Sequence, residues 1–206
     1  MKKNNINKMI NILRTTYPDA KCSLNFENAF QLVVAVCLSA QCTDERVNLT
    51  TPALFAKYKT IEDFANCDLE DLEELIHPCG FYKNKAKNII ETAKKVLNDF
   101  DGIVPSNMED LLALPGVGRK SANVIMLEVF GISQGVAVDT HCKRISNRLG
   151  LSKESDPTKI EFDLIQKFPP ETLKDVNHLF MYFGRDICTA RNPKCEQCPL
   201  RNFCKS

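Results

Sequence analysis

The sequence lacks any long run of apolar residues. Its longest apolar stretch, residues 32–38, is far shorter than the roughly 20 residues that a helix needs to span a bilayer. Polar side chains interrupt the segment that follows the first lysines, so no signal peptide is expected. Low-complexity segments and sequence repeats are missing as well. These absences predict a soluble, cytoplasmic protein with no membrane partner.

An excess of charge of one sign is also missing. The formal net charge is +1 over 206 residues, which excludes a polybasic nucleic-acid coat. It does not exclude a DNA-binding protein, because only one face has to be positive. Hydrophobic and charged fractions of 44% and 26% are typical of a globular protein. The length suffices for one large domain or two small ones.

Strand patterns are scarce, since only Val136–Val138 reads as extended and it is too short to found a sheet. Elsewhere apolar residues recur with helical spacing, as along residues 6–13. Residues 30–38 are apolar all round, as in a helix buried within a bundle. Ser106 and Glu109 have the spacing of a capping box that opens a short helix. The predicted fold is all-α.

A glycine-containing turn is predicted between two helices at residues 114–120, which read Leu-Pro-Gly-Val-Gly-Arg-Lys. Gly116 and Gly118 allow positive φ angles and a close approach of bare backbone to another molecule. The N–H groups of the turn and of the next helix start can then donate to a phosphate. An ordinary corner between helices is the alternative, and the glycine spacing alone does not decide between them.

Lys120 follows this turn directly, in the first turn of the predicted helix. The helix macrodipole disfavours a positive charge at that end, and Arg119 adds a second unfavourable charge. Both effects favour the neutral, nucleophilic amine that Schiff-base chemistry requires. A solvated surface lysine is the alternative interpretation.

A carboxylate, Asp139, comes directly after three apolar residues and just before a predicted helix. It is a candidate N-cap for that helix. The same carboxylate can orient a nucleophile or stabilise a cationic sugar, so the two interpretations are compatible. His141 is interpreted as a packed or DNA-facing residue in preference to a general acid.

Ten cysteines are present, and four of them crowd into the C-terminal tail with the spacing C-x6-C-x2-C-x5-C. These four are Cys188, Cys195, Cys198 and Cys204. Four thiolates at this spacing can enclose one metal centre, whereas disulfides are disfavoured in a reducing compartment. Zinc is a serious competitor, and the spacing does not settle which metal is bound. Arg191 and Lys194, between the first two cysteines, are candidates for phosphate contacts or for solubility alone.

Together these residues resemble the endonuclease III family of helix-hairpin-helix DNA glycosylases. The similarity runs in order over nearly the whole chain, without a large insertion. The segments that carry it are residues 38–44 (LSAQCTD), Gly80-Phe81-Tyr82, Lys85-Ala86, residues 114–124 (LPGVGRKSANV), residues 138–141 (VDTH) with Arg144, residues 183–185 (FGR) and the cysteine tail.

The resemblance implies an all-α helix-hairpin-helix glycosylase fold with DNA in a cleft between two domains. Residues 22–131 are expected to form a six-helix domain that ends in the hairpin. Residues 1–21 and 132–206 together are expected to form a helical domain that holds a [4Fe-4S] cluster on the four tail cysteines. Lys120 and Asp139 would then lie on opposite walls of the cleft.

The resemblance also implies a base-excision repair enzyme that acts on double-stranded DNA with damaged pyrimidines or abasic sites. Lys120 would attack C1′ of the deoxyribose, expel the base as an imine forms, and cut the strand 3′ to the lesion by β-elimination. Asp139 would assist the amine and the developing sugar cation. The cluster would be structural or affect DNA binding. The enzyme is expected to be a monomer, and nucleoid-associated if bacterial.

Several side chains match DNA-contacting positions of the family. Gln41 matches the residue that fills the hole left by the flipped base. Phe81 stands where the family often has a leucine wedge, and an aromatic ring can stack there as well. Further DNA contacts are expected at Gly116, Gly118, Arg119, His141, Arg144, Arg191 and Lys194.

Two other functions compete. A monofunctional glycosylase of the adenine-mismatch type shares the hairpin and cluster, but that branch lacks the lysine and carries a catalytic glutamate before its LSAQ-like segment. Residues 32–38 contain no acid. A non-catalytic DNA-binding module is disfavoured because both Lys120 and Asp139 are present. Phe183, where the family often has histidine, is expected to alter packing only.

Overall fold

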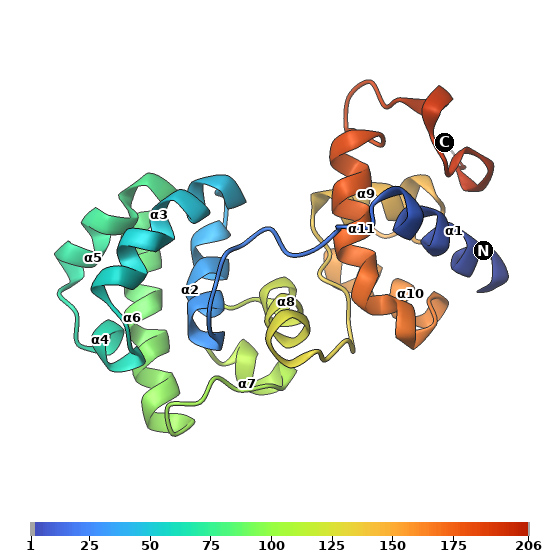
Figure 1. Cartoon of the computed structure of the whole chain (residues 1–206). Coiled ribbons are helices and arrows are strands. Elements are labelled where there is room, and N and C mark those ends of the chain that lie inside the picture. The colour runs from blue at the N-terminus through green and yellow to red at the C-terminus, as the bar shows by residue number, and fades with distance from the viewer. Residues whose placement is uncertain (1–2, 206) are drawn as a thin grey trace. The chain divides into compact units, whose positions relative to one another are not determined.

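The structure is a computed structural model, and it describes residues 3–205. These residues form helices joined by turns and loops and contain no strand, which confirms the all-α prediction (Figure 1). None of their helices has both the length and the apolar character needed to cross a membrane. The chain divides into two compact units, which we call the hairpin unit (Ser23–Gly131) and the tail unit (up to Cys22 and from Ile132 onward).

The hairpin unit is built around α2. From Phe30 to Leu38 every side chain of this helix is buried except that of the polar Gln31, which is half-buried. Helices α3, α6 and α8 pack against it. The helices of this unit are α2 (Ala29–Ser39), α3 (Asp44–Lys57), α4 (Ile61–Ala65), α5 (Leu69–Ile76), the 3-10 helix η1 (His77–Cys79), α6 (Tyr82–Asp99), α7 (Met108–Leu112) and α8 (Arg119–Phe130).

Side-chain caps fix where several of these helices begin. Thr43 caps α3, and Thr60 forms a reciprocal capping box with Asp63 at the start of α4. The capping box predicted for Ser106 and Glu109 is wrong. Asn107 caps α7 instead, because its Oδ1 accepts a hydrogen bond of 2.9 Å from the backbone N–H three residues later.

The tail unit joins both ends of the chain into one core. Ile6, Met9, Ile10 and Leu13 of the N-terminal helix are fully buried against residues from the C-terminal half. The helices of this unit are α1 (Lys3–Thr16), α9 (Thr140–Arg148), α10 (Pro157–Lys167), α11 (Leu173–Asp186) and the 3-10 helices η2 (Pro170–Thr172), η3 (Cys195–Gln197) and η4 (Arg201–Phe203).

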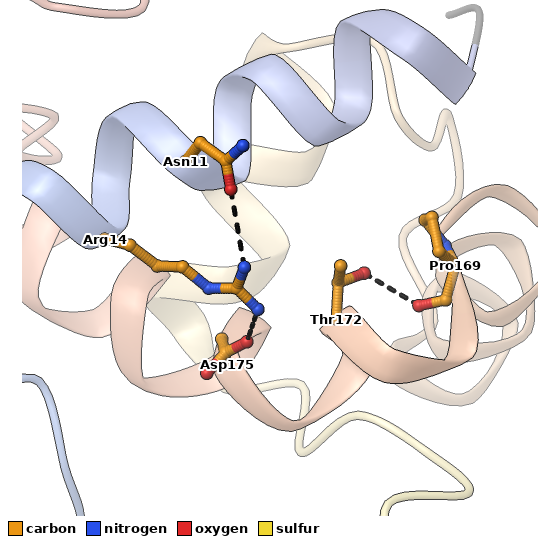
Figure 2. A network of polar contacts seen from close by, with 5 residues as sticks. All are labelled: Asn11, Arg14, Pro169, Thr172 and Asp175. Atoms are coloured by element: carbon orange, nitrogen blue, oxygen red, sulfur yellow. Dashed lines mark hydrogen bonds and ion pairs between the residues drawn. The ribbon is translucent and has the colours of Figure 1, made fainter.

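Polar contacts at the edge of this core attach α1 to α11 (Figure 2). Arg14 pairs with Asp175 of α11 and also donates to Asn11 Oδ1 at 3.4 Å. Beside it, Thr172 Oγ1 donates to Pro169 O at 2.7 Å and fixes the turn that precedes α11. Because the Arg14 and Asp175 side chains are partly exposed, these contacts orient the helices while burial of the apolar stripe supplies most of the stability.

Truncation of this stripe tests whether α1 belongs to the core of the tail unit. We expect Leu13→Ala to lower the free energy of unfolding by about 2–5 kcal/mol, since it removes buried methyl groups and leaves a cavity. Lys8→Ala, on the exposed face of the same helix, should change it by less than about 0.5 kcal/mol. Urea titrations followed by circular dichroism would measure both, and equal effects would contradict the packing of α1.

Candidate functional site

The turn between α7 and α8 is anchored by its apolar side chains and by α6. Leu114 and Val117 are buried, and Val117 N–H donates to Leu114 O at 3.1 Å. Thr92, a buried residue of α6, donates from Oγ1 to Pro115 O at 3.0 Å. The predicted helical hairpin is therefore present and is held to α6 by a hydrogen bond.

The two glycines of this turn are required for different reasons. Gly116 has φ +78°, and a Cβ there would lie 2.9 Å from Nδ2 of Asn88 on α6. A side chain at this position would be strained by its backbone and would displace Asn88. Gly118 is extended, and a Cβ there would meet no atom within 4 Å. Nothing within the chain demands a glycine at 118, so the bare backbone leaves room for another molecule.

The N-terminus of α8 combines these features around Lys120. Gly118 is its N-cap and provides no side-chain acceptor, and the first turn carries no acidic residue. Lys120 is exposed and Arg119 is half-buried, while Ala122 and Ile125 are fully buried and fix the helix. An anion placed at this end would meet the positive end of the helix dipole and two basic side chains.

Gln41 and Phe81 occupy two loops of the same unit, and both have left-handed backbone conformations, with φ of 55° and 49°. Gln41 is exposed in the loop after α2, and the Phe81 side chain is 64% exposed at the start of α6. Left-handed φ is uncommon for non-glycine residues and occurs often where function constrains the backbone. The resemblance had singled out the residue types at these positions, and their unusual conformation is a finding of the structure.

In the tail unit, Asp139 is the N-cap of α9, as its position predicted. Its Oδ1 accepts a hydrogen bond of 2.7 Å from Cys142 N–H, and the side chain is half-buried. The cap fixes the orientation of the carboxylate at the start of a helix that packs against α11.

Arg144 and His141 are held against α11. Arg144 Nη2 donates to Gly184 O at 2.9 Å and lies 3.1 Å from His141 Nδ1, and Arg144 Nε donates to Cys188 O at 3.0 Å. A guanidinium only donates, so this contact requires an unprotonated Nδ1. Burial lowers the pKa of His141, although Asp139 acts in the opposite direction, and the neutral ring is favoured. A Cβ at Gly184 would lie 2.7 Å from His141 Nδ1, which accounts for the glycine there.

Arg148, at the end of α9, attaches the cysteine tail to the core, a role that was not predicted from the sequence. Its Nη1 donates to Thr189 O at 2.8 Å and lies 3.3 Å from Cys188 Sγ, and Nη2 donates to Ala190 O at 3.2 Å. Its own carbonyl accepts from Lys205 N–H at 2.9 Å. The sequence showed only that Arg148 is a basic residue near the end of a predicted helix, which indicates a favourable interaction with the helix dipole and not a contact with the tail.

The four tail cysteines line one cavity of about 400 Å³, together with Arg148 and Arg201. All four are free thiols, and four thiolates are the donor set of an iron–sulfur cluster. Within residues 3–205, no group of three or more His, Cys, Asp or Glu side chains is arranged to hold a single metal ion. A cavity of this size with four sulfur donors around it fits an iron–sulfur cluster.

The two basic residues between the first cysteines differ in their surroundings. Lys194 Nζ pairs with Asp186 at 3.1 Å, and both side chains are about half exposed. Such an exposed pair is weak enough to exchange for another anion. Arg191 is exposed, and its carbonyl accepts from Thr189 Oγ1 at 2.7 Å. Contacts of these residues with DNA stay a prediction.

Two family models match the chain. Residues 34–170 match the HhH-GPD superfamily base excision DNA repair protein, and residues 188–204 match the iron-sulfur binding domain of endonuclease III. The second match begins at Cys188 and ends at Cys204. These findings confirm that the cofactor is a [4Fe-4S] cluster.

Individual proteins are similar over the whole chain. Endonuclease III of Synechocystis sp. is 49% identical over 205 residues, which cover 100% of this chain and 94% of that protein. A non-covalent endonuclease III–DNA complex superposes with a TM-score of 0.93 at 40% identity, covering 100% of this chain and 96% of the other. A trapped endonuclease III–DNA covalent intermediate gives the same values.

The same substitution at the two hairpin glycines should have opposite consequences for stability. We expect Gly116→Ser to lower the free energy of unfolding by about 1–3 kcal/mol, because of its positive φ and the contact with Asn88. Gly118→Ser should leave it unchanged or raise it slightly, since serine is a good N-cap. Thermal denaturation would measure both, and equal losses would contradict the conformation of the turn.

Loss of one tail cysteine should remove the cluster. We expect Cys198→Ser to purify without bound iron and without broad visible absorption, because a ligand is missing. Cys67→Ser, which alters a free, half-buried cysteine of the hairpin unit, should keep both. Iron analysis and absorbance spectra would measure this, and full iron content in Cys198→Ser would exclude Cys198 as a ligand.

Proposed function

Because the chain belongs to the endonuclease III family of base-excision DNA-repair enzymes, we propose that Lys120 is the nucleophile with which it attacks damaged DNA. The chain is a DNA glycosylase and abasic-site lyase with a [4Fe-4S] cluster. The observation that carries the proposal is the exposed amine of Lys120 at the start of α8, directly after a turn whose Gly118 backbone is open.

The proposed reaction begins when a damaged pyrimidine is flipped out of double-stranded DNA. The Lys120 amine attacks C1′ as the bond from C1′ to the base breaks and the base departs. The nitrogen then loses a proton, and the bond from C1′ to the ring oxygen O4′ opens as O4′ takes up a proton, so that C1′ and the nitrogen form a protonated imine. β-Elimination then removes the 3′ phosphate and cuts the strand. The trapped covalent intermediate of a protein 40% identical to this chain supports a covalent path. The first turn of α8 contains no acidic residue, so that turn provides no carboxylate beside the Lys120 amine.

We propose that Asp139 assists this reaction by accepting a proton from the amine or by stabilising the developing sugar cation. Its cap bond to Cys142 N–H uses Oδ1 and holds the side chain in one orientation. A carboxylate fixed in this way loses little entropy when it engages a substrate. His141 and Arg144, which are bonded to each other and to α11, are proposed to support the same DNA-facing surface of the tail unit.

DNA contacts in the hairpin unit are proposed at the turn and at the two left-handed residues. Backbone N–H groups around Gly116 and Gly118, with Arg119, would bind phosphates on one strand and position the duplex without reading its sequence. Gln41 would fill the space that the flipped base leaves, and Phe81 would stack into the opposite strand. The enzyme is proposed to act as a monomer on damaged pyrimidines and abasic sites.

Borohydride trapping tests the role of Lys120. On a duplex with one thymine glycol, the protein should form a covalent complex when borohydride reduces the imine. Lys120→Ala should form none, and its base release should fall by roughly 10³-fold or more. Lys57→Ala, which removes an exposed lysine paired with Asp71 in the same unit, should be trapped as well as the natural protein.

The other outcomes separate the competing functions. Base release without trapping by the natural protein would indicate a monofunctional glycosylase in which water attacks. Binding without base release, on thymine glycol and on an abasic-site duplex alike, would indicate a non-catalytic DNA-binding module. Trapping that persists in Lys120→Ala would assign the nucleophile to another amine.

A further inference from the structure

Lys85 of α6 is a buried lysine that the proposed mechanism does not use. Its side chain is 5% exposed, and Nζ donates hydrogen bonds of 2.9 Å to Leu38 O and to Cys79 O. Both acceptors are backbone carbonyls of the hairpin unit, 47 and 6 residues away in sequence. Because its amine is directed into the protein, Lys85 does not serve as a phosphate contact.

The charge of Lys85 is balanced by helix ends. Leu38 O lies in the last turn of α2, and Cys79 O is the last carbonyl of η1, so the ammonium meets the negative ends of both helices. Two thiols, those of Cys37 and Cys79, sense its charge. Burial raises the pKa of Cys37 to about 11 and also raises the pKa of Cys79, so both thiols are neutral near pH 7. Burying an ammonium is costly, and these two hydrogen bonds offset the cost.

The two carbonyls belong to the two segments that carry the proposed DNA-inserting residues. Leu38 precedes Gln41 by three residues, and Cys79 precedes Phe81 by two. Both Gln41 and Phe81 have left-handed φ, which the surrounding structure has to maintain. The Lys85 ammonium therefore connects the starts of the two loops directly through its two hydrogen bonds.

A second contact joins the same loops. The Cys42 thiol interacts with the Cys79 thiol and helps to raise its pKa, after the larger effect of burial. Cys79 Sγ also lies 3.6 Å from Thr50 Oγ1. These interactions are weak, and Lys85 provides the two strong bonds between the loops.

We propose that Lys85 is a positioning residue that fixes the separation of Gln41 and Phe81, so that both can enter the duplex together. The inference rests on the proposed function of these two side chains. It adds that their insertion depends on an amine that touches neither DNA nor the reacting atoms. Lys85→Met keeps an unbranched side chain that is one atom shorter, but it leaves Leu38 O and Cys79 O without their donor.

The first test measures insertion without chemistry. A duplex carries a tetrahydrofuran abasic-site analogue with 2-aminopurine opposite it, and the fluorescence of 2-aminopurine rises when that base is unstacked. At saturating protein, we expect Lys85→Met to give a clearly smaller rise than the natural protein. Phe64→Leu, a buried change in α4 that removes ring packing against Phe30 at the start of α2, and Lys94→Met, which alters an exposed lysine of α6, should give the full rise. A full rise with Lys85→Met would overturn the proposal.

The second test separates positioning from a general loss of structure. We expect Lys85→Met to lower base release from a thymine glycol duplex by roughly tenfold or more, as small misplacements do. In a Gln41→Ala, Phe81→Ala background, the same change should cost less than about twofold, because coupled residues are not additive. A loss of equal size in both backgrounds would show that Lys85 serves folding alone and would overturn the proposal.

Failure of this inference and failure of the proposed function give different results. If the natural protein forms no covalent complex but its fluorescence rise still depends on Lys85, the Lys120 chemistry is wrong and the positioning role stands. If trapping at Lys120 succeeds but the Lys85→Met rise is full, the chemistry stands and the positioning role is wrong.

Discussion

The hairpin unit depends on the polar residues along the buried side of α6. Lys85 bonds the carbonyls at the ends of α2 and η1, Asn88 lies under Gly116, and Thr92 bonds Pro115. These residues are spaced by three or four along the helix, so they share one side of it. A single rigid helix thereby fixes two loops and a turn whose own backbones are not helical, and these are the segments at which DNA contacts are proposed.

This arrangement explains how the exposed side chains of Lys120, Gln41 and Phe81 can be held in defined positions without being buried. Gln41, Phe81 and Lys120 each begin or precede a helix, and each adjoins a buried anchor: Leu38, Cys79 or Ala122. Stability is supplied below the surface by α6 and α2, and the exposed residues remain available to another molecule. Loops held by a rigid scaffold are the usual location of binding residues for this reason.

The helices could be predicted from the sequence because burial follows the helical period, as along residues 6–13, or because a segment is apolar on all sides, as along residues 30–38. The start of α7 could not, since Ser106 and Asn107 are both good caps and the pattern cannot choose between neighbours. The anchoring roles of Lys85, Asn88 and Thr92 could not be predicted either, because the local sequence does not show which distant backbone group a side chain will contact. Lys85 was visible as a lysine four residues before the buried Ile89, but its acceptors come from segments distant in sequence. Lys120 and the tail cysteines could be proposed because turn, position and spacing carry their chemistry locally.

In the tail unit, α9 links the proposed catalytic carboxylate to the cluster-binding tail. Asp139 caps its first turn, and Arg148 at its last turn binds both sides of the cysteine segment, through its guanidinium at Thr189 O and its carbonyl at Lys205 N–H. Nine helical residues span about 13 Å, which separates the Arg148 anchor from Asp139, and Arg144 Nε also bonds the tail at Cys188 O from the middle of the helix. A cluster that fixes the tail would therefore also hold α9, the helix whose first turn Asp139 caps. This connection supports the expected structural role of the cluster in the tail unit.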